Sequence, residues 1–431
     1  MYHGSLLPKG YIPRIVDAEI SRKLDLFGAV EIAGTMWCGK TWTSMAFGES
    51  LTSVGRFEVR SAVEADPSIA LIGAAPHVID EWQDVPAVWD EVRISVDMHG
   101  GETGMYILTG SSDPRKEKVH HSGAGRIDRI RMSTMTLQET GESFGKISLK
   151  DLFAGKFEPL LIQQKLPPLA EMICRGGWPV AVSRGIGPLD SAEYIKSYFD
   201  ALFEISILRK GLNPQDVEKI SGSLARNVGT AVTLKTLAGD AGWEDKKSAA
   251  GKAGVILEAL RSLYVIQPVM GWDAPIRSKT RLRTKPKYYF ADPSMSAYLL
   301  NVNTERLLTD GQLFGLLFES LCVHDLTVYA AALPEASSSP LYYYRDSDGL
   351  EVDAIIELRD GRWGAFEIKL GENKIIEAAE NLHRLKRKIG LNPAARNPDP
   401  EFLAVLVGAC ETARYDRGND VFVIPVTALG K

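Results

Sequence analysis

Cysteine is scarce in this sequence, and its placement excludes two kinds of site. The four cysteines lie far apart and form no C-x-x-C pair: Cys38, Cys174, Cys322 and Cys410. This spacing fits neither a disulfide framework nor a metal site, so we expect reduced thiols in a cytoplasmic protein. Recognisable metal-ligand spacing is also missing among four of the histidines: His77, His120, His121 and His324.

Long apolar runs and a strong charge of one sign are absent too. No apolar run approaches the roughly 20 residues that span a bilayer. The N-terminal segment MYHGSLLPKGYIPR lacks the apolar stretch of a secretory signal, so we expect no membrane partner. The formal net charge of −5 argues against a wholly basic nucleic-acid coat, although it does not exclude a local basic patch.

What the sequence does contain is enough chain for several cores. Of its 431 residues, 45% are hydrophobic and 24% are charged, which is the composition of a soluble globular protein. A chain of this length exceeds one ordinary core, so we expect about two to four domains.

The most informative segment is a glycine-rich loop near the N-terminus. It fits the phosphate-binding pattern G-x-x-x-x-G-K-[ST] and consists of Gly34, Thr35, Met36, Trp37, Cys38, Gly39, Lys40 and Thr41. The residues before it predict a buried strand (28–33), and those after it predict a helix (41–49). Such a loop surrounds phosphates with backbone N–H groups at a helix N-terminus. We expect Lys40 to reach the outer phosphates and Thr41 to hold Mg²⁺.

Two acids follow the next predicted strand at Asp80 and Glu81. In P-loop enzymes an acid at this place holds magnesium, and a neighbouring carboxylate polarises the attacking water. We assign Asp80 to the metal and Glu81 to the water; a helix-capping acid pair is the alternative. A third strand (104–109) ends in polar residues, and we expect Thr109, Ser111 or Ser112 to lie near the γ-phosphate unless they form only a turn.

Arginines follow in a glycine-containing loop. Arg126 and Arg129 are candidates for stabilising the charge that develops on a transferred phosphoryl group, in their own subunit or toward a neighbouring one. A surface loop with solvated arginines explains them equally well.

Four segments together resemble a family of bacterial and archaeal predicted ATPases in the AAA+ superfamily that carry a C-terminal domain of unknown function. They are YIPRIVD at 11–17, the loop with its Trp37-Cys38 insert, ILTGS at 107–111 and SGAGR at 122–126. The resemblance implies an αβα ATPase core, a DNA-binding-like module and a nuclease-like module. It also implies ATP as the nucleotide and suggests a ring-shaped homo-oligomer. The guanine-reading motif N-K-x-D is absent.

We therefore expect an α/β multidomain chain. Its predicted parts are a P-loop αβα ATPase core (1–160), a helical lid or linker (161–215), a winged-helix-like domain (216–305) and a restriction-endonuclease-like α/β domain (306–431). The winged helix rests on three predicted helices and two strands near 264–266 and 287–290. Between these strands, segment 277–287 has six basic side chains in eleven residues and no acid. Such a segment can neutralise nucleic-acid phosphates, or it can simply keep a hairpin soluble.

The C-terminal part carries a second constellation of Asp353, Glu367 and Lys369, which resembles the D…[DE]-x-K pattern of restriction-endonuclease-like folds. In that chemistry two carboxylates hold Mg²⁺ and the lysine positions or activates water. Segments 351–358 and 363–370 predict a hairpin. A three-residue loop with Gly361 in the left-handed conformation sets Asp353 opposite Glu367, and we predict this register. Glu319 on an upstream helix is a further candidate metal ligand, or a solvated acid.

These residues predict an ATP-binding protein, a Mg²⁺-dependent ATPase that couples its nucleotide state to nucleic-acid binding and, in one version, to cleavage. A regulatory ATP switch that binds a protein partner without nuclease activity is one alternative. A defence or toxin-like component is another. A retired nuclease fold that keeps its polar residues as a binding surface also fits the C-terminal pattern.

Overall fold

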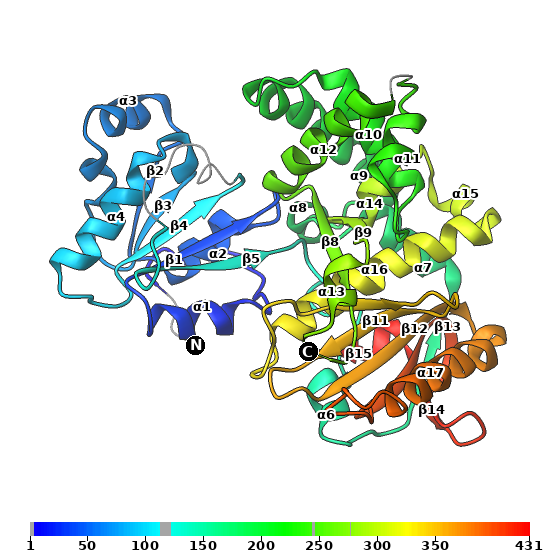
Figure 1. The fold of residues 1–431 in the computed structure, drawn as a ribbon. Helices are drawn as coiled ribbons and strands as arrows, with labels where there is room; N and C mark the ends of the chain where they lie inside the picture. Colours follow the sequence, from blue (N-terminus) through cyan, green and yellow to red (C-terminus); the bar gives the residue numbers. More distant parts are fainter. Residues whose placement is uncertain (1–3, 113–121, 244–245, 276) are drawn as a thin grey trace. The chain divides into compact units, whose positions relative to one another are not determined.

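The computed structural model describes residues 4–112, 122–243, 246–275 and 277–431 (Figure 1). The chain divides into two compact units. The first comprises residues 1–134 with 260–265, and the second comprises residues 135–259 and 266–431.

The first unit is built on a five-stranded sheet in the order β2-β3-β4-β1-β5, with all neighbours parallel. Its strands are β1 (Ala29–Gly34), β2 (Ser50–Ser53), β3 (His77–Asp80), β4 (Tyr106–Gly110) and β5 (Ile127–Met132). Its helices are α1 (Asp17–Leu24), α2 (Lys40–Phe47), α3 (Phe57–Ala65), η1 (Pro67–Leu71), η2 (Trp82–Asp84) and α4 (Ala87–Met98). Strands β1, β3 and β4 are buried along their whole length, as expected for parallel strands covered on both faces.

Alternation along these strands gives the unit two separate cores. Val30 and Ile107 pack with α1 and α2, whereas Ala29 and Leu108 pack with α3 and α4 on the other face. This is the three-layer αβα arrangement expected from the sequence (Figure 1).

The second unit is built on an eight-stranded mixed sheet. Its order is β14-β13-β12-β11-β10-β8-β9, and β7 also pairs with β13. Its strands are β7 (Leu160–Gln164), β8 (Ile266–Gly271), β9 (Lys287–Phe290), β10 (Tyr342–Arg345), β11 (Glu351–Glu357), β12 (Trp363–Gly371), β13 (Phe402–Asp416) and β14 (Val421–Pro425). A separate two-stranded pair joins β6 (Ile147–Ser148) to β15 (Leu429–Gly430).

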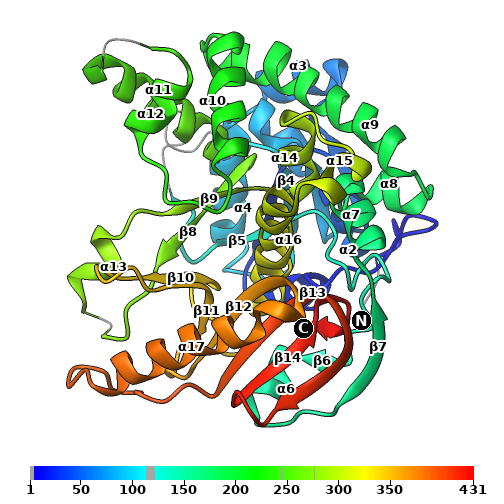
Figure 2. The same ribbon diagram turned by 90° about the vertical axis from the view of Figure 1, so that its right-hand side faces the viewer.

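Helices account for most of the rest of this unit. They are α6 (Leu149–Phe153), α7 (Leu166–Arg175), α8 (Pro179–Ser183), α9 (Pro188–Ala201), the π-helix η3 (Leu202–Ile207), α10 (Pro214–Arg226), α11 (Leu234–Asp240), α12 (Lys246–Ser262), α13 (Lys279–Arg283), α14 (Pro293–Leu299), α15 (Thr304–Thr309), α16 (Gly311–Ala331), η4 (Glu372–Lys374), α17 (Ile375–Gly390) and η5 (Val426–Ala428). Figure 2 shows α16 and α17 beside β11 and β12, and both helices contact these strands.

The strands expected for a winged helix belong to this larger sheet. β8 and β9 pair antiparallel, but β8 also pairs parallel with β10 through Tyr342 and Met270. The three expected helices correspond to α10, α11 and α12. A winged helix is therefore not confirmed, and segments 161–215, 216–305 and 306–431 contribute to one compact unit. The physical reason is that an edge strand with unpaired backbone groups is completed by pairing with a neighbour.

Helix α16 is the one helix in the described part of the chain that is long and apolar enough to cross a membrane. It packs against β11 and β12 instead, and most of its apolar stretch is buried. The expectation that no apolar run nears the spanning length therefore overlooked this segment. Its polar residues Glu319, His324 and Asp325 make contacts described below.

Candidate functional site

The glycine-rich loop connects β1 to α2, as predicted. Gly39 has φ +101° and Trp37 has φ +64°, so the loop turns through left-handed backbone conformations before the helix begins. A Cβ on Gly34 would lie 2.2 Å from the carbonyl oxygen of Met132, which leaves room only for glycine. The Lys40 ammonium is buried and donates to the carbonyl of Thr35 at 2.7 Å. Successive N–H groups in such a turn form an anion-binding concavity.

Side chains from three elements meet beside this loop. The Thr41 hydroxyl donates to Asp80 Oδ1 at 2.9 Å, and the Thr109 hydroxyl donates to the same oxygen at 2.5 Å. They meet because β1, β3 and β4 are parallel neighbours whose carboxyl ends share one edge of the sheet. The structure thus brings together the residues that the sequence assigned to the metal and to the third strand.

Glu81 is held at the same edge. Its backbone is left-handed, with φ +57°, and its N–H donates to Thr109 Oγ1 at 3.3 Å. Its carboxylate accepts hydrogen bonds from Ser111 at 3.2 Å and from Gln83. Ser112 is half-buried and is the last residue described before the gap at 113–121. A carboxylate fixed in this way is positioned to orient a water molecule.

The two arginine candidates lie away from the loop of their own chain, and a role toward a neighbouring subunit stays a prediction for both. Arg126 precedes β5, whose first residue Ile127 pairs with Ala29, at the amino end of the strands. Five residues of strand, about 16 Å, separate it from the loop, so it cannot serve its own nucleotide site. Arg129 lies in the middle of β5, where its Nε and Nη2 donate to the buried Glu31 carboxylate at 2.6 and 2.9 Å. A buried carboxylate requires such a partner, so Arg129 is a structural cation.

Sequence reasoning missed Arg14 as part of this site. Its Nη1 donates to the carbonyl of Cys38 inside the loop, and its Nη2 donates to the carbonyl of Ser133 after β5, both at 2.9 Å. Its backbone N–H donates to Asp17 at 2.9 Å, and Tyr11 donates to Asp17 at 2.7 Å. The segment YIPRIVD supported the family resemblance, but nothing in it indicated a contact with the loop.

These residues fit a nucleoside triphosphate with a divalent cation. The loop and Lys40 offer donors for phosphate oxygens, while Thr41 and Asp80 offer two oxygens for Mg²⁺. The left-handed turn and the tight approach at Gly34 are the observations that this fit depends on.

The second predicted constellation lies in the second unit, in the predicted register. Ala354 pairs with Phe366 and Glu357 with Trp363, so the same register places Asp353 opposite Glu367. The Leu358 N–H donates to the carbonyl of Arg362, which leaves a three-residue loop. Gly361 in that loop has φ +88°. The register and the left-handed glycine are both confirmed.

Asp353 also lies at a break in the pairing with β10. Tyr342 pairs with Ile355 and Tyr344 with Val352, so two residues of β11, at 353 and 354, oppose one of β10. A β-bulge of this kind redirects a side chain and occurs often next to active sites.

The acids and the lysine form one cluster. Lys369 Nζ donates to Glu367 Oε2 at 2.5 Å and to Asp353 Oδ2 at 3.3 Å, and the N–H of Ile368 donates to Asp353 at 2.8 Å. Burial, with the charge of Asp353, raises the pKa of Glu367 to about 8. Glu367 Oε1 is buried and has no hydrogen-bond partner in the structure. No group of three or more His, Cys, Asp and Glu side chains suited to a metal occurs among the described residues, so this site has two carboxylates with a lysine between them.

A second layer of charges adjoins Asp353, and it corrects two expectations. Glu319 is not a solvated acid, because Tyr289 donates to its carboxylate at 2.6 Å and Lys287 at 3.1 Å. Its role as a metal ligand stays a prediction. Lys287, expected on an exposed basic wing, is buried and also pairs with Glu351 at 2.7 Å. These carboxylates raise the pKa of Lys287 against the opposing effect of burial.

The remaining basic segment is only partly available to a partner. Arg281 makes a bidentate ion pair with Glu357, with both N–O distances 2.7 Å. The exposed cations that remain are Arg277, Lys279, Arg283 and Lys285. Four of the six expected basic side chains are therefore free to face solvent.

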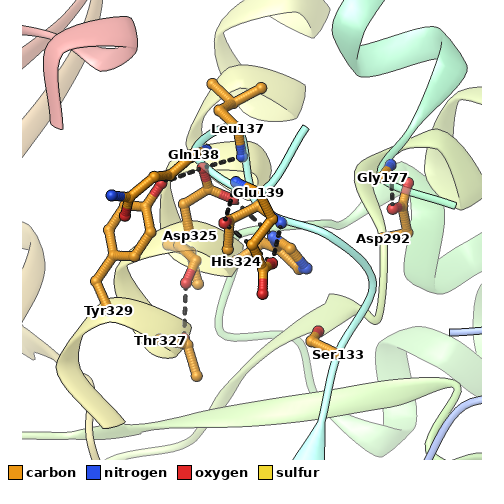
Figure 3. A network of polar contacts seen from close by, with 12 residues as sticks. Ser133, Leu137, Gln138, Glu139, Gly177, Asp292, His324, Asp325, Thr327 and Tyr329 are labelled. Atoms are coloured by element: carbon orange, nitrogen blue, oxygen red, sulfur yellow. Dashed lines mark hydrogen bonds and ion pairs between the residues drawn. The ribbon is translucent and has the colours of Figure 1, made fainter. Parts of the chain in front are cut away.

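A polar network fixes the segment that enters the second unit after β5 (Figure 3). The Asp325 carboxylate accepts from the Leu137 N–H at 3.0 Å and contacts His324 Nδ1 at 2.8 Å. Tyr329 donates to Asp325 at 3.2 Å and accepts from the Gln138 N–H at 3.3 Å. Burial lowers the pKa of His324, but the hydrogen bond and charge of Asp325 raise it overall, and burial raises the pKa of Asp325. The two side chains form a buried, hydrogen-bonded anchor for this segment.

Comparison with known proteins gives three matching families that follow one another along the chain. Residues 27–141 match an AAA domain, residues 167–306 match a domain of unknown function (DUF8612), and residues 314–429 match a domain of unknown function (DUF4143). The first match covers the loop 34–41 and both acids at 80 and 81. The chain thus combines an AAA-type ATPase-like domain with a C-terminal domain of unknown function, as the resemblance implied.

Similar proteins have been found in mycobacteria and in an archaeon. The uncharacterized proteins Rv2008c of Mycobacterium tuberculosis and Mb2031c of Mycobacterium bovis are each 25% identical over 360 residues, which is 82% of this chain and 72% of theirs. The Walker-type ATPase PABY2304 of Pyrococcus abyssi is 13% identical, with a TM-score of 0.41 over 69% of this chain and 99% of that one.

Proposed function

We propose that this protein is a Mg²⁺-dependent ATPase whose nucleotide state controls nucleic-acid binding by its second unit. The proposed ATPase activity rests on one observation: Thr41, Asp80 and Glu81 lie together beside the glycine-rich loop. The AAA domain match over residues 27–141 supports ATP as the nucleotide.

Each residue of the nucleotide site has a separate role in the proposed hydrolysis. Loop N–H groups and Lys40 hold the phosphates, and Thr41 with Asp80 holds Mg²⁺, which neutralises charge on the phosphoryl oxygens when it is bound. Glu81 orients the attacking water, and Ser111 with Gln83 holds that carboxylate in place. Thr109 connects the metal ligand Asp80 to the backbone of Glu81, so that both acids respond to the same phosphate.

A chain of contacts supports the coupling between nucleotide and second unit. Arg14 joins the loop carbonyl of Cys38 to the carbonyl of Ser133, so a shift of the loop acts on the end of β5. Four residues further along the chain, Leu137 is anchored to Asp325 on α16. The same helix carries Glu319 about 1.7 turns earlier, at the edge of the acid cluster. A rigid helix that carries both residues is a physical route for such coupling.

The basic segment supports nucleic acid as the partner. Two ion pairs, Arg281 with Glu357 and Lys287 with Glu351, hold it along β11 on either side of Asp353 in the strand. The exposed cations at 277, 279, 283 and 285 therefore lie on a segment tethered beside the acid cluster. Cations in such a row neutralise successive phosphates without reading bases.

A second candidate function, phosphodiester cleavage, rests on the cluster itself. Asp353 and Glu367 face each other with Lys369 between them, and the unpaired buried oxygen of Glu367 is a vacant acceptor for a cation. These two carboxylates would hold Mg²⁺, which would activate water and neutralise charge at the phosphate. Lys369 would then be released to contact the scissile phosphate.

The first experiment measures ATP hydrolysis with Mg²⁺, with and without DNA, for wild type, Lys40→Ala and the exposed control Lys9→Ala. We expect loss of hydrolysis in Lys40→Ala alone and stimulation by DNA in wild type. Replacing Arg277, Lys279 and Arg283 together by Glu should remove the stimulation and leave basal hydrolysis intact. Hydrolysis that ignores DNA, but responds to a protein partner, would favour the regulatory switch.

The second experiment measures Mg²⁺-dependent nicking of plasmid DNA by wild type, Asp353→Asn, Lys369→Met and the exposed control Asp399→Asn. We expect nicking in wild type and in the control only. Equal activity in all four proteins would exclude the assigned cluster. Binding without nicking in wild type would favour a retired nuclease site that serves as a binding surface.

We also propose a cytoplasmic location. All four cysteines are buried and free, which fits reducing surroundings. Fractionation of the producing cells would check it, and recovery in a membrane or extracellular fraction would contradict it.

A further inference from the structure

Two tryptophans stand out because they are exposed. Five tryptophans are almost fully buried: Trp82, Trp89, Trp178, Trp272 and Trp363. By contrast, Trp42 is 51% exposed and Trp37 is 36% exposed, and both lie within the nucleotide loop or directly after it. An exposed indole loses the hydrophobic stabilisation that burial gives, so its placement beside a ligand site indicates contact with the ligand.

The position of Trp42 relative to the phosphates follows from its neighbours. Trp42 is the third residue of α2, so its N–H is one of the free donors at the start of the helix. Lys40 turns back into the loop, and Thr41 turns to the metal ligand Asp80. These two side chains fix the outer-phosphate end of the nucleotide. The donor at residue 42 is then left for the inner phosphate, from which the nucleoside extends.

The next residue, Thr43, lies on a side of α2 that the N-terminal segment covers. Thr43 is buried, and its hydroxyl lies 3.3 Å from the hydroxyl of Tyr11. The N-terminal segment therefore covers α2 at Thr43, while the indole of Trp42 stays open to solvent. An aromatic face at the nucleoside end of a phosphate site is suited to stack on a base.

We propose that Trp42 stacks on the base of the bound nucleotide and gives the site a preference for purines over pyrimidines. The larger surface of a purine gives the stronger stack. This inference rests on the proposed nucleotide binding. It concerns only the base, since the phosphates are held by the loop, Lys40 and the metal ligands.

The test compares ATP, CTP and inorganic tripolyphosphate as ligands of the full chain, by calorimetric titration with Mg²⁺. For Trp42→Leu we expect the Kd of ATP to rise about tenfold, a typical loss when an aromatic partner of a base is removed. The Kd of tripolyphosphate should stay unchanged, because that ligand has no base. Trp42→Phe should restore most of the ATP affinity, and the exposed control Phe57→Leu should match wild type.

The outcomes separate the two proposals. If Trp42→Leu binds ATP like wild type, or if it weakens tripolyphosphate as much as ATP, the stacking role is wrong while nucleotide binding stands. If wild type binds neither ATP nor tripolyphosphate, and Lys40→Ala changes nothing, the proposed nucleotide site itself is wrong. A wild-type protein that binds CTP as tightly as ATP would also overturn the purine preference.

Discussion

Replacing Arg129 tests whether this arginine is a structural cation or a catalytic one. Its guanidinium makes two hydrogen bonds to Glu31, whose carboxylate is fully buried on the central strand β1 and also accepts from Trp82 at 3.2 Å. Arg129→Ala would leave that carboxylate buried without a counter-charge. Breaking such a pair typically costs about 3–5 kcal/mol, a large part of the stability of one domain.

The assay is differential scanning calorimetry of the full chain, in which we expect the transition of the first unit to fall by roughly 10 °C. Two matched variants sharpen the result. Arg126→Ala removes an exposed ion pair with Asp97 and an exposed hydrogen bond to the Ala124 carbonyl, and it should cost less than about 1 kcal/mol. The double variant Glu31→Gln/Arg129→Met removes both charges, keeps an acceptor for Trp82 and should recover most of the loss. A single Arg129→Ala variant with unchanged melting and abolished hydrolysis would refute the structural role.

Three further predictions concern the loop, the anchor and the acid cluster. Gly34→Ala should abolish ATP binding measured by calorimetry, because its Cβ would lie 2.2 Å from the Met132 carbonyl; Gly187→Ala, with open space around it, should bind normally. Asp325→Ala should lower the free energy of unfolding of the second unit by about 2–4 kcal/mol, since it removes the acceptor of the buried Leu137 N–H and a partner of the buried His324; a loss below 1 kcal/mol in urea unfolding would contradict the anchor. The pKa of Glu367 is raised from 4.5 to about 8 in the folded state. Between these two pH values the folded protein keeps a proton on Glu367 that the unfolded chain has released. The free energy of unfolding should therefore fall by about 3–5 kcal/mol as the pH rises from 4.5 to 8. Glu367→Gln should remove this slope in urea titrations at pH 5, 7 and 9, and an unchanged slope would show that another group causes it.

The parts of the two sites that could be predicted from the sequence are those that short, contiguous segments determine. The loop 34–41 is a contiguous segment whose glycines dictate its turn, so its placement between β1 and α2 was predictable. The same holds for the hairpin of β11 and β12, because loop length and the left-handed Gly361 set the register that brings Asp353 opposite Glu367. Even the meeting of Asp80 with the loop follows from the rule that parallel strands present their carboxyl ends at one edge.

The partners of charged residues could not be predicted in the same way. The sequence makes Arg129 a finger candidate, whereas the structure pairs its guanidinium with Glu31, which is 98 residues away in the sequence. Lys287 belonged to a run of six basic residues, and only the tertiary fold distinguishes it, buried against Glu319 and Glu351, from the exposed Lys285. A charge run in a sequence does not show which of its members is neutralised by distant acids.

The sequence by itself therefore determined the local machinery: a phosphate-binding turn, two acids after a strand, and a hairpin with its register. Short-range sterics and strand alternation fix these features whatever surrounds them. Only the tertiary structure decided that the expected wing belongs to the C-terminal sheet, that Arg14 ties the loop to the end of β5, and that α16 carries both Asp325 and Glu319. These depend on which buried charges and open strand edges find partners, and such partners are chosen by the packing of the whole chain.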